Sequence, residues 1–500
     1  MVTATRSPGF DGPLSTTDRT SIAALRAVLE QHGFTGGAVV EALGTALGKS
    51  HQRDDLPLYL RRLEAPTPIN TLVKLFVLDR SVDESRAAAA CAPLDLDALR
   101  EIGLVEDGPR GLRARLRLSV HDGLILAHDA YDDERKTLRP DHVLDVNPTT
   151  ISLSNLTVRR PVKRALEIGT GCGVLALVAS RHAGQVVATD TNPRALNLAA
   201  FNAAINGITN VEWRLGSLFD TVDGERFDLI FSNPPYVISP DSQFIFRDGG
   251  RRGDALCEEI VRRAPAFLND GGFASFLINW AIPAAEEWSA PLRRWVDANH
   301  CDSWLMMSAA QDPTTYAAVW NRSRDRDAYT SGLDRWIRYF EELGLRALGL
   351  GAVVLRRRAA GTPWVRADHL ADSVTAPAGA HIERLFEAED HLAATQDDTA
   401  LLGQSFLAVP DHRLHQILRI EDGRYAIETA EVRLQGGLPF RGQLDAYAIQ
   451  LLARCDGHRT LAAIAQEIAD EAGVNPAPFI SACAAIARRL VSTGFLVVRL

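Results

Sequence analysis

One run of residues, 165–173, constrains the fold most, because an apolar stretch with a single acid leads directly into three glycines. It reads ALEIGTGCG and is followed by the apolar segment VLALVAS. Glycine tolerates positive φ and lets a ligand approach the main chain, so Gly169, Gly171 and Gly173 favour a tight strand-to-helix turn. The G-x-G-x-G spacing differs from the G-x-G-x-x-G loop that cradles a pyrophosphate. The run predicts an α/β domain in which Glu167 accepts hydrogen bonds from a cationic amino-acid group.

A second apolar run, Val186–Asp190, ends in a carboxylate about 20 residues further along the chain. At the end of a second strand, an acidic side chain can accept hydrogen bonds from both hydroxyls of a ribose. The alternatives are a structural turn with Asp190 as an ordinary helix cap, and, more weakly, a dinucleotide site. Two acidic strand ends in one βαβ unit favour a ribose-bearing cofactor.

A third strand runs into Asn-Pro-Pro-Tyr, in the segment FDLIFSNPPY of residues 227–236. The prolines stiffen the chain and remove main-chain donors. The side-chain oxygen of Asn233 and the carbonyl of Pro234 can then accept hydrogen bonds from one NH₂ group on a planar acceptor. Tyr236 offers a flat face for stacking on that group. The alternative is a strand-end turn with a surface tyrosine.

Together, EIGTGCG, Asp190 and NPPY resemble the class I S-adenosylmethionine-dependent methyltransferases with an N-P-P-Y motif. That family includes the glutamine methyltransferases of release factors and the base-amino methyltransferases of RNA and DNA. The resemblance covers the central part of the chain and implies a seven-stranded doubly wound sheet with S-adenosylmethionine at its carboxyl edge. The chain also resembles actinobacterial methyltransferases of similar three-part layout.

The resemblance also assigns the site residues. Ser217 stands where many relatives carry an aspartate that contacts the adenine, so Ser217 or the main chain of Leu218 is expected to make that contact. No metal is implied. The implied cofactor-binding residues are Glu167, Gly169, Thr170, Gly171, Asp190, Thr191, Ser217, Leu218 and Asn233, and the implied catalytic residues are Asn233, Pro234 and Tyr236.

Further along, the loop FIFRDGG of residues 244–250 resembles the glycine-rich loop that follows NPPY in the glutamine methyltransferases. Arg247 or Asp248 is a candidate substrate contact, and a solvated loop with an internal ion pair is the alternative. Asn279 and Trp280 stand at the end of the next strand, where they could border the acceptor cleft; for Trp280, packing in the core is the favoured prediction.

The chain divides into three predicted domains after a flexible tail of about 15 residues rich in glycine, proline and hydroxyl side chains. In residues 16–142, helices are predicted first, where Ile22, Leu25, Val28 and Leu29 recur at helical spacing. The strands 112–120 and 123–127 then form a hairpin at Asp122-Gly123, which suggests a winged-helix-like substrate module. Residues 143–358 form the methyltransferase domain, and residues 361–380 a linker. Residues 381–500 read as a helical, winged-helix-like module with a small β element, in which Asp456-Gly457 forms a turn and Thr460 caps the helix of residues 461–472. The module is loosely similar to domains that capture leader peptides, and a dimerisation or scaffold role is the alternative.

The composition restricts the classes of partner and the cellular location that we expect for the chain. The net charge of −9 leans against a nucleic-acid partner, whose phosphates select a basic surface. The six cysteines form no C-x-x-C pair, and no apolar run reaches the length of a membrane helix, so a cytoplasmic protein is expected.

These observations favour methyl transfer to a nitrogen of a protein or peptide. Three alternatives stay open: a carboxylate O-methyltransferase acting on a ribosomally made peptide, an RNA base N-methyltransferase, and a non-catalytic domain that only binds. The oligomeric state is left open.

Overall fold

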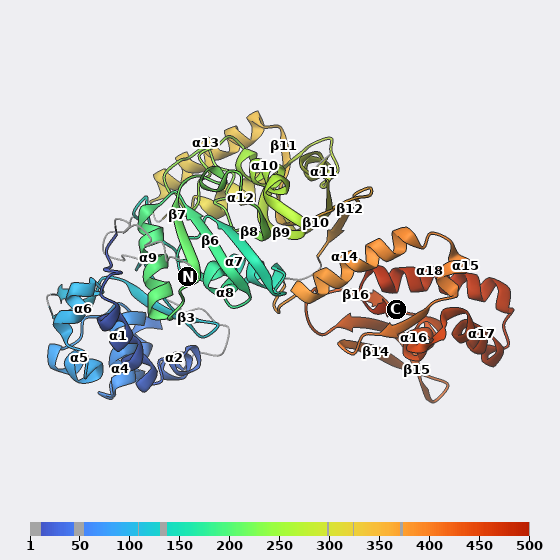
Figure 1. Cartoon of the computed structure of the whole chain (residues 1–500), viewed down its shortest axis with the longest axis horizontal. Helices are drawn as coiled ribbons and strands as arrows, with labels where there is room; N and C mark the ends of the chain where they lie inside the picture. The colour runs from blue at the N-terminus through green and yellow to red at the C-terminus, as the bar shows by residue number, and fades with distance from the viewer. Residues whose placement is uncertain are drawn as a thin grey trace. The chain divides into compact units, whose positions relative to one another are not determined.

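The computed structural model describes residues 12–44, 55–108, 110–130, 138–297, 300–323, 325–370 and 374–499. Most of the predicted N-terminal tail therefore lies outside the described residues. Within them, no helix is both long and apolar enough to cross a membrane. The chain forms two compact units (Figure 1), the first made of residues 1–153, 161–305 and 309–366, the second of residues 154–160, 306–308 and 367–500.

A large mixed sheet forms the centre of the first unit, in the order β12-β10-β11-β9-β8-β5-β6-β7. The strands β7, β6, β5, β8 and β9 pair in parallel, and β11 pairs antiparallel with β9. The α/β methyltransferase fold predicted from the sequence is thereby confirmed. The strands are β5 (Val162–Ile168), β6 (Ala183–Asp190), β7 (Val211–Leu215), β8 (Phe227–Ser232), β9 (Leu268–Pro283), β10 (Cys301–Gln311), β11 (Leu345–Arg357) and β12 (Val365–His369).

The prediction of seven strands is wrong by one edge strand. β12 lies inside the segment predicted as a linker, where proline and glycine concealed a short extended stretch. Its approach to β10 is held by the hydrogen bond from the Ser303 N–H to the Trp364 carbonyl (2.9 Å). The guanidinium of Arg366 also lies over the Trp304 ring, 5.1 Å from its centroid. These contacts cover an edge of β10 that would otherwise expose unpaired main-chain groups.

Helices join the strands and pack on the sheet. α8 contacts β5 and β6, α9 contacts β6 and β7, and α10 contacts β9, as βαβ connections require. These helices are α7 (Pro148–Leu156), α8 (Val174–Ala179), α9 (Pro193–Ile205), α10 (Ala255–Arg263), α11 (Ala290–Val296), α12 (Pro313–Trp320) and α13 (Arg326–Glu342), with short 3₁₀ turns at Asp220–Val222 and Ala264–Phe267.

The N-terminal residues of the first unit form helices and two hairpins. The predicted helical periodicity is confirmed in the first helix, which buries Ile22, Leu25, Val28 and Leu29. A single strand was predicted over residues 112–120, but the structure divides it between two hairpins, β1–β2 and β3–β4. The elements are α1 (Arg19–Gln31), α2 (Gly36–Leu43), α3 (Leu56–Arg62), α4 (Pro68–Leu72), the π-helix Val73–Val77, α5 (Glu84–Cys91), α6 (Leu96–Ile102), β1 (Val105–Gly108), β2 (Gly111–Ala114), β3 (Arg117–His121) and β4 (Leu124–His128).

Two asparagines of α9 and the asparagine that caps its C-terminal end bind this N-terminal region to the α/β region. Asn202 accepts from the Ala127 N–H (2.7 Å) and donates to the Ala127 carbonyl (3.0 Å), and Asn206 pairs in the same way with Ile125. Asn197 does so with the main chain of Leu14. Each amide thus satisfies one main-chain donor and one acceptor, as a neighbouring strand would. The N-terminal region and the sheet belong to one compact unit.

The second unit contains more β structure than the sequence indicated. The predicted cap of Thr460 on α17 is confirmed, since its hydroxyl accepts from the Ala463 N–H (3.2 Å). The predicted turn at Asp456-Gly457 instead begins a strand, and the sheets have the orders β17-β13-β18 and β14-β15-β16. The elements are α14 (Gly379–Ala394), α15 (Asp398–Leu402), β13 (Ser405–Ala408), β14 (His412–Glu421), β15 (Arg424–Leu434), β16 (Arg441–Gln443), α16 (Ala446–Arg454), β17 (Asp456–Thr460), α17 (Leu461–Ala472), α18 (Pro476–Ser492) and β18 (Leu496–Val498).

Candidate functional site

A cavity of about 430 Å³ opens at the carboxyl ends of the parallel strands. Loops that follow β5, β6, β7 and β8 meet there, because the ends of parallel strands share one edge of a sheet. The structure brings every site residue predicted from the sequence into this one lining. They are Glu167, Gly169, Thr170, Gly171, Asp190, Thr191, Ser217, Leu218, Asn233, Pro234 and Tyr236.

The glycine run forms the turn between β5 and α8. Gly169, Gly171 and Gly173 have φ values of 72°, 54° and 86°, a region that residues with a Cβ rarely adopt. A Cβ added at Gly169 or Gly171 would meet no atom within 4 Å, so these two leave open space beside the cavity. A Cβ at Gly173 would lie 2.8 Å from the Cβ of Ala199. The third glycine therefore serves the packing of α8 against α9.

Glu167 ends β5 with a buried carboxylate. It accepts hydrogen bonds from the Thr170 hydroxyl (2.5 Å) and from the Ala176 N–H in the first turn of α8 (3.0 Å). Burial raises the pKa of this carboxyl group to about 8, and the nearby charge of Asp190 adds to the increase. Such a group gains from a cation beside it, because the cation offsets the loss of hydration.

Asp190 ends β6 and organises the glycine turn. Its carboxylate accepts from the N–H groups of Gly171 (2.9 Å) and Asn192 (2.8 Å), and burial raises its pKa. The cap of α9 is Asn192, whose side chain accepts from the Arg194 N–H (3.0 Å). The interpretation of Asp190 as an ordinary helix cap is therefore wrong.

Ser217 and Leu218 follow β7 on another side of the cavity. Leu218 has a φ of 49°, which is uncommon for a residue with a bulky side chain. The N–H of Gly216 donates to the carbonyl of Asp190 (2.9 Å), which ties this turn to the end of β6. The strained turn holds the main chain of Leu218 at the lining.

The two polar side-chain atoms of Asn233 differ in their hydrogen bonding. Its Nδ2 donates to the hydroxyl of Thr150 (3.1 Å) and lies 3.5 Å from that of Thr149. Its Oδ1 is buried and has no hydrogen-bond partner among the described residues. Buried polar atoms are nearly always paired, so an unpaired acceptor in a cavity indicates a donor supplied by a ligand.

Pro234 and Tyr236 continue the lining beyond Asn233. Tyr236 packs against the buried cluster that contains Val237 and Ile238. Burial raises the pKa of the phenol, so Tyr236 presents a neutral ring at physiological pH.

The loop after Asn-Pro-Pro-Tyr carries an internal ion pair. Arg247 binds Asp248 through two hydrogen bonds of 2.8 and 3.0 Å, and Asp248 also accepts from the N–H groups of Gln243 and Phe244. The structure confirms the ion pair of that alternative, with Asp248 buried and Ile245 and Gly250 of the same loop exposed. Arg247 and Asp248 both line the cavity, so their predicted role as substrate contacts stays a prediction. Trp280 is fully buried, as predicted, and its indole N–H donates to the Trp288 carbonyl (2.9 Å).

Sequence reasoning missed the segment that runs into α7 over the cavity. His142, Asp145, Asn147, Thr149 and Thr150 all contribute to the lining. The available signal was Asn-Pro-Thr-Thr, a helix start in which Asn147 accepts from the Thr150 N–H (2.9 Å). It predicts a helix end, but it does not indicate that the hydroxyls of this end face Asn233. Phe246 and Trp320 were missed as well.

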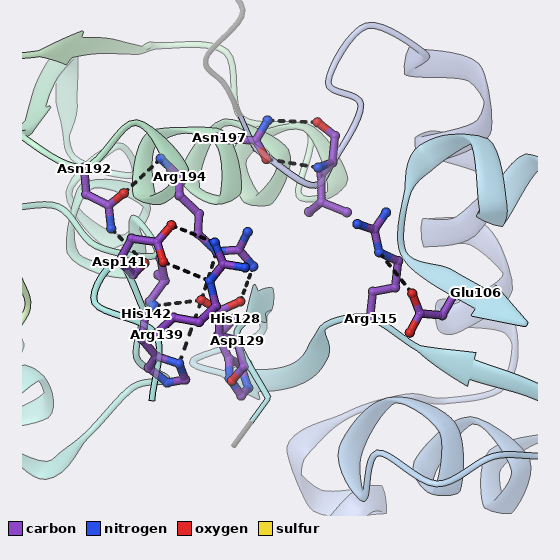
Figure 2. A network of polar contacts seen from close by, with 12 residues as sticks. Glu106, Arg115, His128, Asp129, Arg139, Asp141, His142, Asn192, Arg194 and Asn197 are labelled. Carbon is purple, nitrogen blue, oxygen red and sulfur yellow. Dashed lines mark hydrogen bonds and ion pairs between the residues drawn. The ribbon is translucent and has the colours of Figure 1, made fainter. Parts of the chain in front are cut away.

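A buried polar network anchors that segment to α9 (Figure 2). Arg194 forms an ion pair with Asp129, with a distance of 3.1 Å from its Nε to Oδ2. The same carboxylate accepts from the Val143 N–H (2.9 Å), and Asn192 donates to the Asp141 carbonyl (3.0 Å). Since Asn192 also contacts Asp190, the network joins the covering segment to the strand that ends at the cavity.

Within the part of the chain that the structure describes, no group of three or more His, Cys, Asp and Glu side chains is placed to hold a metal ion.

Comparison with known proteins gives one family match over the site residues and another in the N-terminal part of the chain. A family model described as "Methyltransferase small domain" matches residues 143–296, and one described as "Domain of unknown function (DUF7059)" matches residues 31–115. The chain is 38% identical over 136 residues to the release factor glutamine methyltransferase of Xylella fastidiosa (strain 9a5c), which covers 25% of this chain and 49% of that protein. It is 32% identical over 219 residues to the release factor glutamine methyltransferase of Geobacter sulfurreducens, covering 41% and 73%.

The chain thus spans about half the length of the first of these relatives and almost three quarters of the second. Among solved structures, the ribosomal protein L11 methylase of Lactobacillus delbrueckii subsp. bulgaricus is 19% identical, with 43% of this chain and 82% of that chain covered and a TM-score of 0.25.

Proposed function

The chain belongs to the class I S-adenosylmethionine-dependent methyltransferases that include the release factor glutamine methyltransferases, and on that premise we propose that it methylates a side-chain amide nitrogen of glutamine in a protein. The family membership supplies the cofactor. The substrate class rests on the lining of the acceptor side of the cavity.

The lining fits S-adenosylmethionine, which supplies a methyl group on a positively charged sulfonium. The open faces of Gly169 and Gly171 leave room beside the turn for the amino-acid portion. Glu167 provides a buried carboxyl group for the cationic end, and Asp190 provides acceptors for the ribose hydroxyls. Thr191 and Thr170 lie beside these carboxylates, while Ser217 and the main chain of Leu218 line the side proposed for the adenine.

The observation that carries the proposal is the unpaired Oδ1 of Asn233. Its amide cannot turn freely, because Thr150 holds Nδ2 (3.1 Å). The site therefore presents an acceptor, and with the Pro234 carbonyl it suits an NH₂ group. A glutamine amide supplies that group on a planar frame that can stack on Tyr236. A carboxylate has no hydrogen to donate, and would face two oxygens that repel it.

Held in this way, the amide nitrogen is oriented with its lone pair towards the methyl carbon. S-adenosylmethionine, when bound, would supply the methyl group: a nitrogen–carbon bond would form as the carbon–sulfur bond of the sulfonium broke, and the nitrogen would lose one proton to water. Asn233 and Pro234 contribute orientation and hydrogen bonds that strengthen as positive charge develops on the nitrogen. No acid–base pair of side chains is required for this step.

Labelled methyl transfer to a lysate tests the proposal directly. The protein is incubated with methyl-labelled S-adenosylmethionine and a lysate separated into protein, peptide and RNA fractions, with the Asn233→Ala variant as control. Label in protein that survives mild base and is recovered on glutamine is the expected result. Label lost in base would indicate a carboxylate ester, and label confined to RNA would indicate a base methyltransferase; either would overturn the proposal.

Replacing Asp190 by Asn is expected to weaken binding of S-adenosylmethionine about 10- to 100-fold. The substitution retains one oxygen but removes the charge, and hydrogen bonds to a charged acceptor contribute about 1.5–3 kcal/mol. Calorimetric titration measures the effect, with Asp223→Asn as a control at an exposed position outside the lining. Equal affinities of the Asp190→Asn variant and the unmodified protein would contradict the assignment of the ribose.

The affinity for S-adenosylmethionine is also expected to depend on pH through Glu167. Burial raises the pKa of this group to about 8, so the free protein holds a proton there at neutral pH. The cationic cofactor favours the ionised form, so binding releases the proton and becomes tighter as pH rises towards 8, by up to about tenfold per unit.

Titrations between about pH 6 and 9, in two buffers of different ionisation enthalpy, measure the released proton. Glu167→Gln should remove the slope, whereas Glu258→Gln, in a surface ion pair with Arg262, should retain it. A slope that persists in Glu167→Gln would assign the proton to another group.

A further inference from the structure

The hairpin of β14 and β15 in the second unit has an open edge. In the sheet of order β14-β15-β16, β14 pairs with β15 and with no other described strand. The main-chain groups on the other edge of this ten-residue strand therefore have no strand partner among the described residues. Long open edges of this kind are sites of association with another strand.

The hairpin is amphipathic across its two faces. Successive residues of a strand point to opposite faces, so Leu414, Leu418 and Ile420 share one face of β14. The register places Leu418 opposite Ile427 and Ile420 opposite Tyr425 on β15. These four side chains are 49%, 51%, 70% and 74% exposed, which is unusual for large apolar groups.

The opposite face of β14 carries charges at its two ends. Arg413 is the second residue of the strand and Glu421 the last, with Ile417 midway between them and 61% exposed. Within one chain, Glu421 also forms an exposed ion pair with Arg419 (3.2 Å). A second β14, antiparallel and related by a twofold axis at Ile417, would place Arg413 opposite Glu421 in both directions. It would also place Leu414 opposite Ile420 of the second copy, on the apolar face.

We propose that two copies of this chain associate through β14, with the two strands antiparallel about a twofold axis at Ile417. The two three-stranded sheets would then form one continuous sheet across the axis. The proposed association concerns the oligomeric state of the chain, and it is independent of the reaction proposed for the first unit.

The sequence of β14 favours a second copy over an unrelated extended peptide, because the strand is complementary to itself. One register satisfies the open edge, keeps the apolar face continuous and pairs both terminal charges with opposite charges. His415 lies opposite Arg419 of the second copy in that register, where an imidazole nitrogen can accept from the guanidinium. The bulge that interrupts the β14–β15 register lies on the β15 side, so β14 itself continues regularly past Ile417.

Sedimentation of the full chain over a range of concentrations tests the association. The expected result is a reversible monomer–dimer equilibrium of the 54.5 kDa chain. Ile417→Lys, which places two like charges at the axis, should weaken dimerisation at least about tenfold. Thr429→Lys is the matched control, since Thr429 lies opposite Ile417 on β15 but away from the open edge, and it should leave the dimer unchanged.

A charge-reversal pair tests the register itself. Arg413→Glu alone and Glu421→Arg alone each create two like-charge pairs and should each dimerise more weakly than the unmodified chain. Mixed in equal amounts, the two variants should form a heterodimer, because each Glu then faces an Arg. Near-ultraviolet circular dichroism of each variant checks that the fold is retained. A chain that stays monomeric, a dimer indifferent to Ile417→Lys, or a mixture no tighter than the separate variants would overturn the proposal.

Discussion

Replacing Asn233 by Ala is expected to lower kcat for methyl transfer by about a hundredfold or more, while the free protein unfolds as before. Among the described side chains of the lining, the substitution removes the only buried acceptor atom that has no hydrogen-bond partner. Losing one preorganised polar group at a reacting centre costs about 10²–10³ in rate. The affinity for S-adenosylmethionine, measured by calorimetry, should change much less than kcat.

The two threonines of α7 provide a graded companion test. Thr150→Val removes the 3.1 Å partner of the Asn233 amide and should lower kcat by about tenfold, as expected for one hydrogen bond. Thr149→Val removes a longer contact to the same amide (3.5 Å), together with the hydrogen bond from the Thr149 hydroxyl to Asn147 Oδ1 (2.6 Å), and should disturb Asn233 less than Thr150→Val does. Full activity in both Asn233→Ala and Thr150→Val would show that the acceptor binds elsewhere in the cavity.

Breaking the ion pair between Arg194 and Asp129 is expected to destabilise the first unit by about 3–5 kcal/mol, because removal of one partner leaves a buried charge. The side chains are 14% and 6% exposed, and Asp129 also binds the Val143 N–H (2.9 Å). Arg194→Met should therefore lower the free energy of unfolding in urea. It should also reduce activity, since Val143 belongs to the segment that covers the cavity.

An exposed ion pair in the same unit serves as the control. Arg26 and Glu30 are 2.6 Å apart, but their side chains are 42% and 58% exposed, so Arg26→Ala should cost less than about 1 kcal/mol. The double variant Arg194→Met with Asp129→Leu should recover part of the lost stability, because it removes both charges. If Arg194→Met were no more harmful than Arg26→Ala, the network would not anchor the covering segment.

The residue pattern alone sufficed for the parts of the site that lie close together in the chain. Gly169 and Gly171 need positive φ values and open space, and both requirements follow from a strand that turns sharply into a helix. Asp190 and Asn233 each end a parallel strand, so their meeting at one sheet edge follows from strand order. Family membership followed from these motifs and is confirmed by the relatives of similar sequence.

The orientation of Asn233 depended on the tertiary structure. Thr150 is 83 residues away in sequence, and nothing in Asn-Pro-Thr-Thr distinguishes a helix start that faces solvent from one that faces an amide. The same holds for Arg194 and Asp129, which are 65 residues apart. Side-chain contacts between distant segments depend on how the helices pack, and local periodicity carries no information about that packing.

The sequence did not predict the eighth strand or the β14–β15 hairpin, for a different reason. β12 is only five residues long and lies among prolines and glycines, so its strand structure depends on pairing with an open edge of β10. Both faces of the hairpin are exposed within the chain, so neither face packs on a core that would require the strand. Where burial or main-chain geometry restricts a residue, the chain's own pattern revealed the structure; where a distant partner stabilises the element, only the folded chain could.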